Sequence, residues 1–526
     1  MLQTVEFAVA ALACIILAAL VERRTGVPPA VLQVLVGLVY GLLPGPNLTL
    51  DPDVVLVLVI PLLLYSAALN ASLQEIRANL RPVLSLSVVL VVLTTLAVGL
   101  SVAAVVPGVP LAAAVALGAA VAPPDPVAAL AVGRRAGLSS HLTSLIEGEG
   151  LLNDATALTA FEVAVGVALG SGFSVAAAGG RFAYAAVGGA LVGLAVAWLI
   201  RLVRRHLDEP VIENALSLAT PFLAYVPAES LHVSGILAVV VAGLWLGHQA
   251  PVLLSGPSRL QIRAVWRVVD FLLEGFVFLL IGDQLPVVIA ALQAYPLPVV
   301  LGAALATVAA VLLVRPVWLV LSFWLVDGRW RGPGATARPA GGELLALTWA
   351  GTRGVISLAA VVSLPVSFPF RDLLLLCAYS VVLVTLVGQG LSFGPLLRAL
   401  GLRPERAEEV QQWAMARTAA IAAGLRRLDE LTDDQPALAA AAVRLRQRAA
   451  ERQELGDEWL RRLTADAIGL EEEDEDGPAI QSVRLRREMI AAERDELLRW
   501  RAAGRLPDAG LRAAERELDH EEDILP

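Results

Sequence analysis

The chain has 526 residues, of which 57% are hydrophobic, and a mean hydropathy of +0.71. This composition excludes a large soluble enzyme and indicates a polytopic membrane protein with a soluble appendage. The net charge of −9 belongs to the last part of the chain. Residues 401–526 hold 20 Arg against 29 acids, whereas residues 1–400 hold 20 of each, and the chain has no Lys.

Long apolar runs predict thirteen membrane-spanning helices within the first 400 residues. They cover approximately residues 5–21, 27–43, 54–70, 83–106, 111–131, 144–170, 181–203, 211–227, 233–248, 268–286, 296–325, 343–365 and 371–397.

The arginines between these runs test the number of spans, because cytoplasmic loops carry an excess of positive charge. One set of alternate loops holds fifteen arginines and the other set holds only Arg181 and Arg371. This distribution places the N-terminus outside and the C-terminal tail in the cytoplasm. The fifteen are Arg23, Arg24, Arg77, Arg81, Arg134, Arg135, Arg201, Arg204, Arg205, Arg259, Arg263, Arg267, Arg329, Arg331 and Arg338.

Two predicted spans contain a signal for a broken helix. The fifth holds Pro-Pro-Asp-Pro at 123–126 and the twelfth holds Gly-Thr-Arg-Gly at 351–354. If the seventh span is a linker, the first six and last six spans form inverted repeats in which these two correspond, and such pairs indicate a substrate site near the middle of the membrane. We expect Asp125 and Arg353 to offset the facing half-helix ends. The alternative is that Pro-Pro-Asp-Pro forms a surface turn.

The sixth span contains an unusual density of polar groups at Glu147-Gly-Glu149-Gly-Leu-Leu-Asn153-Asp154. An acid within lipid costs roughly 2.5 to 3.5 kcal/mol on an insertion scale, so function is the default interpretation. On a helix Glu149 and Asn153 share a face, while Asp154 lies about 140° away from Glu149, so the two acids need different partners. The alternative is that these groups only join helices through hydrogen bonds.

Arg315 lies well inside the apolar run of the eleventh span. A buried arginine needs an acidic partner, and Glu149 is the natural candidate because it is the deeply placed carboxylate without another assignment.

These motifs resemble those of monovalent cation/proton antiporters of the NhaP and NHE type. Residues 149–154 are similar to the family's Glu-Ser-Leu-Leu-Asn-Asp, Asp125-Pro126 to its Thr-Asp-Pro, residues 349–358 to its Gly-Leu-Arg-Gly-Ala-Ile-Ser-Leu, and residues 276–285 to its Phe-Leu-Leu-Ile-Gly-Xaa-Gln-Leu. The matches follow the family's order and cover the chain from about residue 1 to 400.

The resemblance implies a homodimer in which each protomer has a core bundle, made of spans 4 to 6 and 11 to 13, and a dimerisation bundle. It also implies that Asp154 is the cation and proton site with Asn153 as its neighbour, and that Glu149 and Arg315 form a structural ion pair. This chain departs from the family pattern at Pro124 (usually Thr), Gly150 (usually Ser) and Ser66 (often an acid).

The expected mechanism follows from one buried carboxylate. Removal from water disfavours the charged form and a bound cation favours it, so proton and cation compete for the same oxygens of Asp154. A hard cation suits oxygen ligands, which here are Asp154, the carbonyls of Pro123 and Pro124, and the Asn153 amide. Because Asn153 cannot ionise, we expect an electroneutral one-for-one exchange of Na⁺ for H⁺, with K⁺ or Li⁺ as alternative cations and a rocking core bundle.

The predicted fold is an all-α polytopic membrane protein with thirteen transmembrane helices, inverted repeats and two crossing interrupted helices. Residues 1–400 are expected to form the transmembrane cation/proton exchanger domain and residues 401–526 a helical, regulatory cytoplasmic tail. The expected location is the plasma (inner) membrane, and the expected partners are the lipid bilayer and a second copy, with no nucleic acid.

No phosphate loop, nucleophile elbow or metal motif is present in the sequence, so we expect no cofactor and no enzymatic activity. A cation channel would share the buried charges without obligatory proton movement. An intramembrane enzyme could use Glu149 and Asp154 as paired acids, but that would leave the two helix breaks unexplained.

Overall fold

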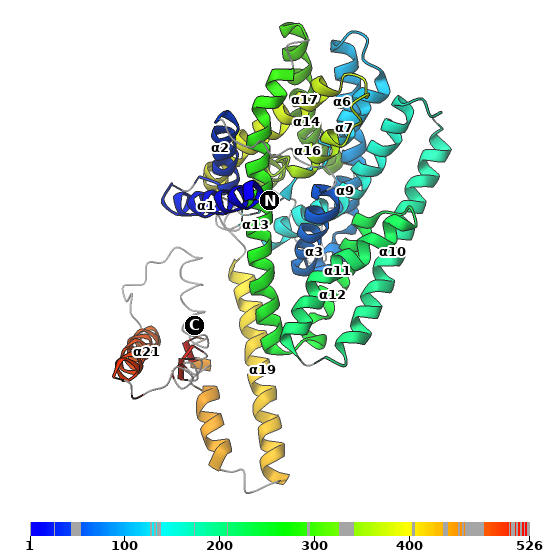
Figure 1. Ribbon diagram of the computed structural model, residues 1–526. Helices are drawn as coiled ribbons and strands as arrows, with labels where there is room; N and C mark the ends of the chain where they lie inside the picture. Colours follow the sequence, from blue (N-terminus) through cyan, green and yellow to red (C-terminus); the bar gives the residue numbers. More distant parts are fainter. Residues whose placement is uncertain are drawn as a thin grey trace. The chain divides into compact units, whose positions relative to one another are not determined.

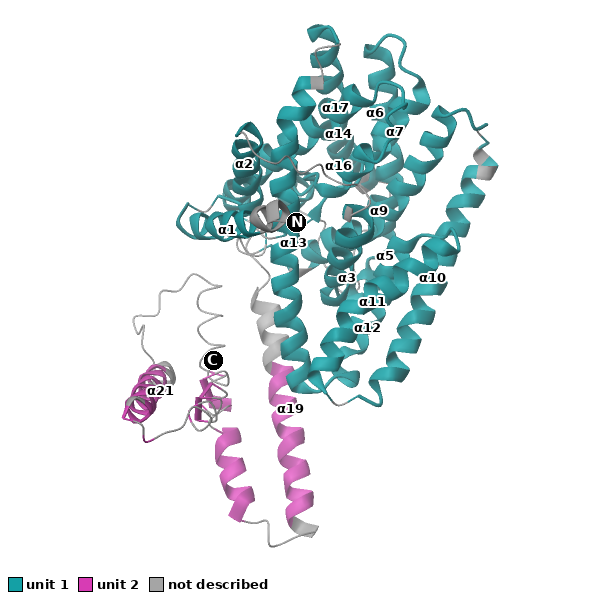
Figure 2. Ribbon diagram, in the orientation of Figure 1, with its two compact units in different colours: residues 1–402 teal, residues 403–526 magenta. Residues whose placement is uncertain are grey.

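The computed structural model describes residues 2–25, 27–43, 54–126, 138–172, 174–207, 209–291, 295–325, 341–401, 406–434, 440–450 and 478–503, with isolated residues in the stretches 129–133, 453–457 and 505–522. No strand occurs among these residues. The predicted loop arginines Arg134, Arg135, Arg329, Arg331 and Arg338 lie outside them. The chain divides into two compact units, residues 1–402 and residues 403–526 (Figure 2).

Helices lie over every one of the thirteen predicted segments of the first unit (Figure 1). They are α1 (Leu2–Thr25), α2 (Pro29–Leu42), η1 (Val54–Val59), α3 (Ile60–Asn70), α4 (Leu73–Ala78), α5 (Leu80–Leu84), η2 (Ser85–Leu90), α6 (Val91–Val105), α7 (Leu111–Val121), α9 (Ser140–Ala168), α10 (Val175–Arg204), α11 (Pro210–Ser230), α12 (Gly235–Leu253), α13 (Gly256–Ala291), α14 (Leu297–Leu325), α15 (Gly341–Trp349), α16 (Val355–Val362), α17 (Arg371–Leu383), η4 (Val384–Gln389) and α18 (Gly390–Leu400).

Six of the described helices are long and apolar enough to cross a membrane. They span Leu80–Val105, His141–Ala168, Ala178–Arg204, Gly235–Leu253, Leu297–Ser322 and Arg371–Leu400, and shorter apolar helices cover Pro29–Leu42, Val55–Asn70 and Leu111–Val121. Helices of this length and composition are typical of a multi-pass membrane protein.

Both segments with a break signal are interrupted. Helix α7 ends at Val121, and residues 122–125 are not helical. Helix α15 ends at Trp349, and α16 begins only at Val355. The Pro-Pro-Asp-Pro run is not a surface turn, because Pro123 and Pro124 are buried. The prolines interrupt the first helix because they remove backbone donors and clash with the preceding turn.

Small residues bring the helices close together. On α2 and α13, Gly37 and Gly282 face one another, and a Cβ atom added to either would collide with the carbonyl of Leu279 or of Val34 on the opposite helix. Such contacts are typical of helices in membranes, where packing rests on van der Waals contact between close backbones rather than on removal from water.

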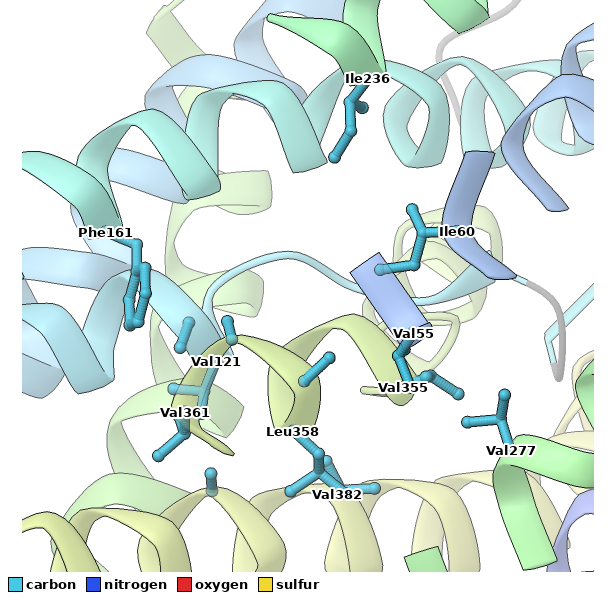
Figure 3. Close-up of a cluster of buried hydrophobic side chains, with 14 of the residues drawn as sticks. Val55, Ile60, Val121, Phe161, Ile236, Val277, Val355, Leu358, Val361 and Val382 are labelled. Carbon is cyan, nitrogen blue, oxygen red and sulfur yellow. The ribbon is translucent and has the colours of Figure 1, made fainter. Parts of the chain in front are cut away.

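An apolar cluster surrounds the second interrupted segment (Figure 3). Leu358 of α16 is 1% exposed and lies beside Val382 of α17, while Val121 marks the end of α7 in the same cluster. The short helix α16 is therefore held by packing on several sides, as a helix of only eight residues requires.

The second unit contains α19 (Arg406–Asp434), α21 (Pro478–Ala502) and a further helical stretch at 440–450. Ion pairs join Arg486 to Glu521 at 2.6 Å and Arg494 to Asp519 at 2.5 Å. These are surface pairs of a charged helical segment, and each contributes little to stability on its own.

Replacing Gly282 by Ala is expected to lower the thermal unfolding temperature in detergent, because the added methyl group meets the backbone of α2. Overpacking of this kind costs about 1–3 kcal/mol. The matched control is Gly180→Ala on α10, where nothing lies within 4 Å of the added atom, so stability should be unchanged or slightly higher. Equal unfolding temperatures for the two variants would contradict the close contact.

Candidate functional site

The two interrupted segments are joined to each other by hydrogen bonds. The backbone N–H of Asp125 donates to the carbonyl of Thr352 at 2.7 Å, and the Thr352 hydroxyl donates to the carbonyl of Asp125 at 2.7 Å. Non-helical backbone is tolerated inside a membrane protein only where its polar groups find partners. Each break therefore supplies partners for the other.

Arg353 lies at the ends of two half-helices and is 2% exposed. Its Nε donates to the carbonyl of Val121, the last residue of α7, at 3.0 Å, and its Nη1 donates to the carbonyl of Gly351, just after α15. No carboxylate of the described residues lies within 4 Å of this guanidinium. The positive charge is instead stabilised by carbonyls at helix C-termini, where the helix dipole is negative.

Asp125 lies at the N-terminal end of the half-helix α16. Its carboxylate packs against Gly354, the residue that precedes α16, so closely that a Cβ atom at this position would overlap the carboxyl group. A negative charge is favourable at a helix N-terminus. Glycine is required at 354 because any larger residue would displace Asp125.

Asn153 and Asp154 bring α9 to the break that follows α7. Asn153 is fully buried and donates from Nδ2 to the carbonyl of Pro124 at 3.0 Å, while its Oδ1 has no partner among the described residues. Asp154 is 3% exposed, and no hydrogen bond or ion pair joins its carboxylate to another described side chain. The Asp125 carboxylate lies within range of electrostatic interaction with it. Pro123 and Pro124 are both buried at this break.

Glu149 has a different environment from Asp154 although both are on α9. Arg315 of α14 donates from Nη1 and Nη2 to its two carboxylate oxygens at 2.5 and 2.8 Å, and from Nε to the carbonyl of Leu347 at 2.9 Å. Glu149 is 1% exposed and Arg315 2%. This bidentate pair joins α9, α14 and α15 and neutralises both charges, so Glu149 serves as a cross-link between helices.

Two acids that sequence reasoning missed lie on α13. The hydroxyl of Ser66 on α3 donates to Asp270 Oδ2 at 2.5 Å. Ser66 stands at the position where the antiporter family that this chain resembles often has an acid. Glu274 lies one turn further along α13, within electrostatic range of Asp125 and Asp270. The signal was available in the sequence, since two acids spaced four apart within a predicted span are functional candidates by default.

Of the residues predicted for the site, the structure brings Asn153, Pro124, Asp125 and Arg353 to the two breaks, and it places Glu149 with Arg315. Glu147 is half-buried on α9.

In the part of the chain that the structure describes, no three His, Cys, Asp or Glu side chains are grouped to hold a metal ion. The arrangement offers one isolated buried carboxylate with nearby carbonyl and amide oxygens, which suits a weakly held hard cation or a proton.

Known proteins are similar to this chain in sequence and in fold. Residues 9–399 match the family described as "Sodium/hydrogen exchanger, transmembrane". An uncharacterized Na(+)/H(+) exchanger of Mycobacterium tuberculosis is 35% identical over 437 residues, which cover 81% of this chain and 80% of that protein. The Na(+)/H(+) antiporter ApNhaP of Aphanothece halophytica is 31% identical over 384 residues, covering 73% and 71% of the two chains.

A third relative, named as a sodium, potassium, lithium and rubidium/H(+) antiporter of Bacillus subtilis, is 32% identical over 380 residues, which cover 69% of this chain and 56% of that protein. Among solved structures, the sodium proton antiporter MjNhaP1 from Methanocaldococcus jannaschii has the same fold. Its TM-score is 0.61 at 20% sequence identity, and the match covers 76% of this chain and 99% of that one.

Replacing Arg315 by Ala is expected to destabilise the protein by about 3–5 kcal/mol, because the change leaves the Glu149 carboxylate buried without a counter-charge. The measurement is thermal unfolding in detergent. The matched control is Arg181→Ala, which removes a pair with Glu162 whose side chains are 61% and 60% exposed, and which should have almost no effect. If Arg315→Ala unfolded at the wild-type temperature, the structural role of the pair would be wrong.

Proposed function

The chain belongs to the family of transmembrane sodium/hydrogen exchangers, and we propose that it is a secondary active antiporter that exchanges Na⁺ or another monovalent cation for H⁺ across the plasma membrane. The observation that carries this proposal is the isolation of Asp154. Its carboxylate is buried, lies beside two interrupted helices and lacks a positively charged partner among the described residues. A buried carboxylate without a counter-ion is costly, so it must be protonated or hold a cation.

The single carboxylate leads to a one-for-one, electroneutral exchange. Asp154 takes either one proton or one cation, and Asn153 with the carbonyls of Pro123 and Pro124 completes an oxygen environment for the ion. Asn153 carries no charge in either state. Glu149 is neutralised by Arg315 and takes no part in the exchange.

Asp125 and Arg353 set the electrostatics around the ion. The carboxylate at the N-terminal end of α16 and the guanidinium at the C-terminal end of α7 offset the half-helix dipoles, and thereby keep the breaks in place when the cation leaves. Neither residue is proposed to carry the transported proton.

The wider proposal concerns topology and assembly. We infer thirteen transmembrane helices with inverted repeats, an outside N-terminus, a cytoplasmic regulatory tail and a homodimer in which the core bundle rocks against its scaffold. Such exchange would contribute to pH homeostasis. K⁺ is the alternative cation, because one relative is named as an antiporter of sodium, potassium, lithium and rubidium.

A cation channel is the competing function of another class. Fluorescence dequenching of a pH gradient in vesicles separates the two, because an antiporter responds to added cation without a voltage shunt whereas a channel needs the shunt. The same assay with Na⁺, K⁺ and Li⁺ determines the transported cation.

Asp154→Asn is expected to abolish cation-driven proton movement in proteoliposomes, because an amide carries no negative charge to balance a cation and does not take up and release a proton near neutral pH. Folding should survive, since Asn has the same shape. The control is Asp372→Asn, an acid at the start of α17 whose side chain is 47% exposed, which should exchange like wild type. Retained exchange in Asp154→Asn would refute the assignment.

Asp125→Asn and Arg353→Gln are each expected to lose transport, because either change removes a charge that stabilises a half-helix end. The measurement is initial rate of exchange in proteoliposomes, with the amount of folded protein determined by gel filtration. Wild-type rates in either variant would remove that residue from the site.

A further inference from the structure

Along one face of helix α13 the side chains change from exposed to buried. Arg263 and Arg267 are exposed, Asp270 and Glu274 on the same side are partly buried, and Ile281 further along is 1% exposed. Spacings of three and four residues keep these side chains on one side of the helix. The two acids lie between the exposed end of α13 and its buried half, and the hydrogen bond from Ser66 shows that Asp270 faces α3.

This face of α13 approaches the interrupted helix α16. Val277 lies one turn beyond Glu274, and Figure 3 shows it beside Val355, the first residue of α16. Val355 follows Gly354, against which the Asp125 carboxylate packs. Glu274 therefore lies on the part of α13 that faces the segment holding Asp125, and Asp125 lies near Asp154 across the break after α7.

The polar atoms along this route include oxygens that lack donors. Asp270 Oδ2 accepts from the Ser66 hydroxyl, but its Oδ1 is buried without a partner. Asn153 Oδ1, on a fully buried side chain whose amide nitrogen is bonded next to Asp125, is also unpartnered within the described chain. No arginine or histidine of the described residues lies within 4 Å of Asp270 or Glu274, unlike Glu149.

Carboxylates without counter-charges and unpaired oxygens of this kind suit a positively charged ligand. The two arginines on the same face lie at the solvated end, where water and salt screen their charge.

We propose that Asp270, Glu274 and the Ser66 hydroxyl form a second cation site, the α13 site, which captures the monovalent cation on its way from the N-terminal side of α13 to Asp154. This inference rests on the proposed function and assigns the α13 site a role in attraction rather than in exchange. By the loop arginines, the N-terminal side of α13 is cytoplasmic. A cation can shed part of its water at these oxygens before reaching the buried carboxylate.

Everted membrane vesicles, which expose the cytoplasmic face, test the proposal with the full-length protein. Asp270→Asn and Glu274→Gln should each raise the apparent KM for Na⁺ by roughly ten-fold, because each variant removes a carboxylate that increases the local concentration of cations. The maximal response at saturating Na⁺ should remain. Ser66→Ala keeps both negative charges and should raise the apparent KM by a smaller factor. Asp270→Glu also keeps the negative charge, so its apparent KM should equal that of the wild type.

Glu162→Gln is the control, since it neutralises an acid of α9 whose side chain is 60% exposed and should leave KM unchanged. An unchanged KM in both Asp270→Asn and Glu274→Gln, or a loss of maximal response at constant KM, would overturn the α13 site. If Asp270→Asn failed to fold, Glu274→Gln and Ser66→Ala would still decide the matter. The proposed function fails separately, namely if the wild type gives no response to Na⁺, K⁺ or Li⁺.

Discussion

The cost of holding a charge away from water governs the interior of this protein. Three solutions occur among the buried charges of the first unit. Glu149 and Arg315 neutralise each other through two hydrogen bonds. Arg353 is stabilised by carbonyls at helix ends. Asp154 has neither a cationic partner nor a hydrogen-bond donor among the described residues, and for this reason we propose that it, rather than Glu149, holds the mobile ion.

The helix breaks make these solutions possible. A continuous helix consumes its own carbonyls and N–H groups, so it has none to offer a buried ion. By stopping α7 and α15 inside the protein, the chain exposes carbonyls to Arg353 and places the Pro124 carbonyl next to Asn153. The hydrogen bonds between Asp125 and Thr352 hold the two breaks together without either of them being helical.

Helix α13 also carries acids near the interrupted segments, namely Asp270 and Glu274. Glycines pack α13 against α2, and the same helix also contacts α3 and α16. Gly282 lies eight residues beyond Glu274, so the glycines and the acids occupy faces of the helix about 80° apart. One face of α13 is fixed by backbone contact and another carries acids, and we propose that this helix forms a rigid wall of the ion path while the interrupted segments rearrange.

The sequence by itself determined where the helices lie, where two of them break and which family the chain belongs to, because apolar run length, proline chemistry and contiguous motifs are local properties. It also named Arg315 as the arginine that needs Glu149. Only the tertiary structure decided which carbonyls stabilise Arg353, namely those of Val121 and Gly351, and that Asp270 lies against Ser66, which is 204 residues away. Helical spacing reports which face of a helix a residue occupies, but not which other helix that face meets, and the partner of a buried charge depends on that second fact.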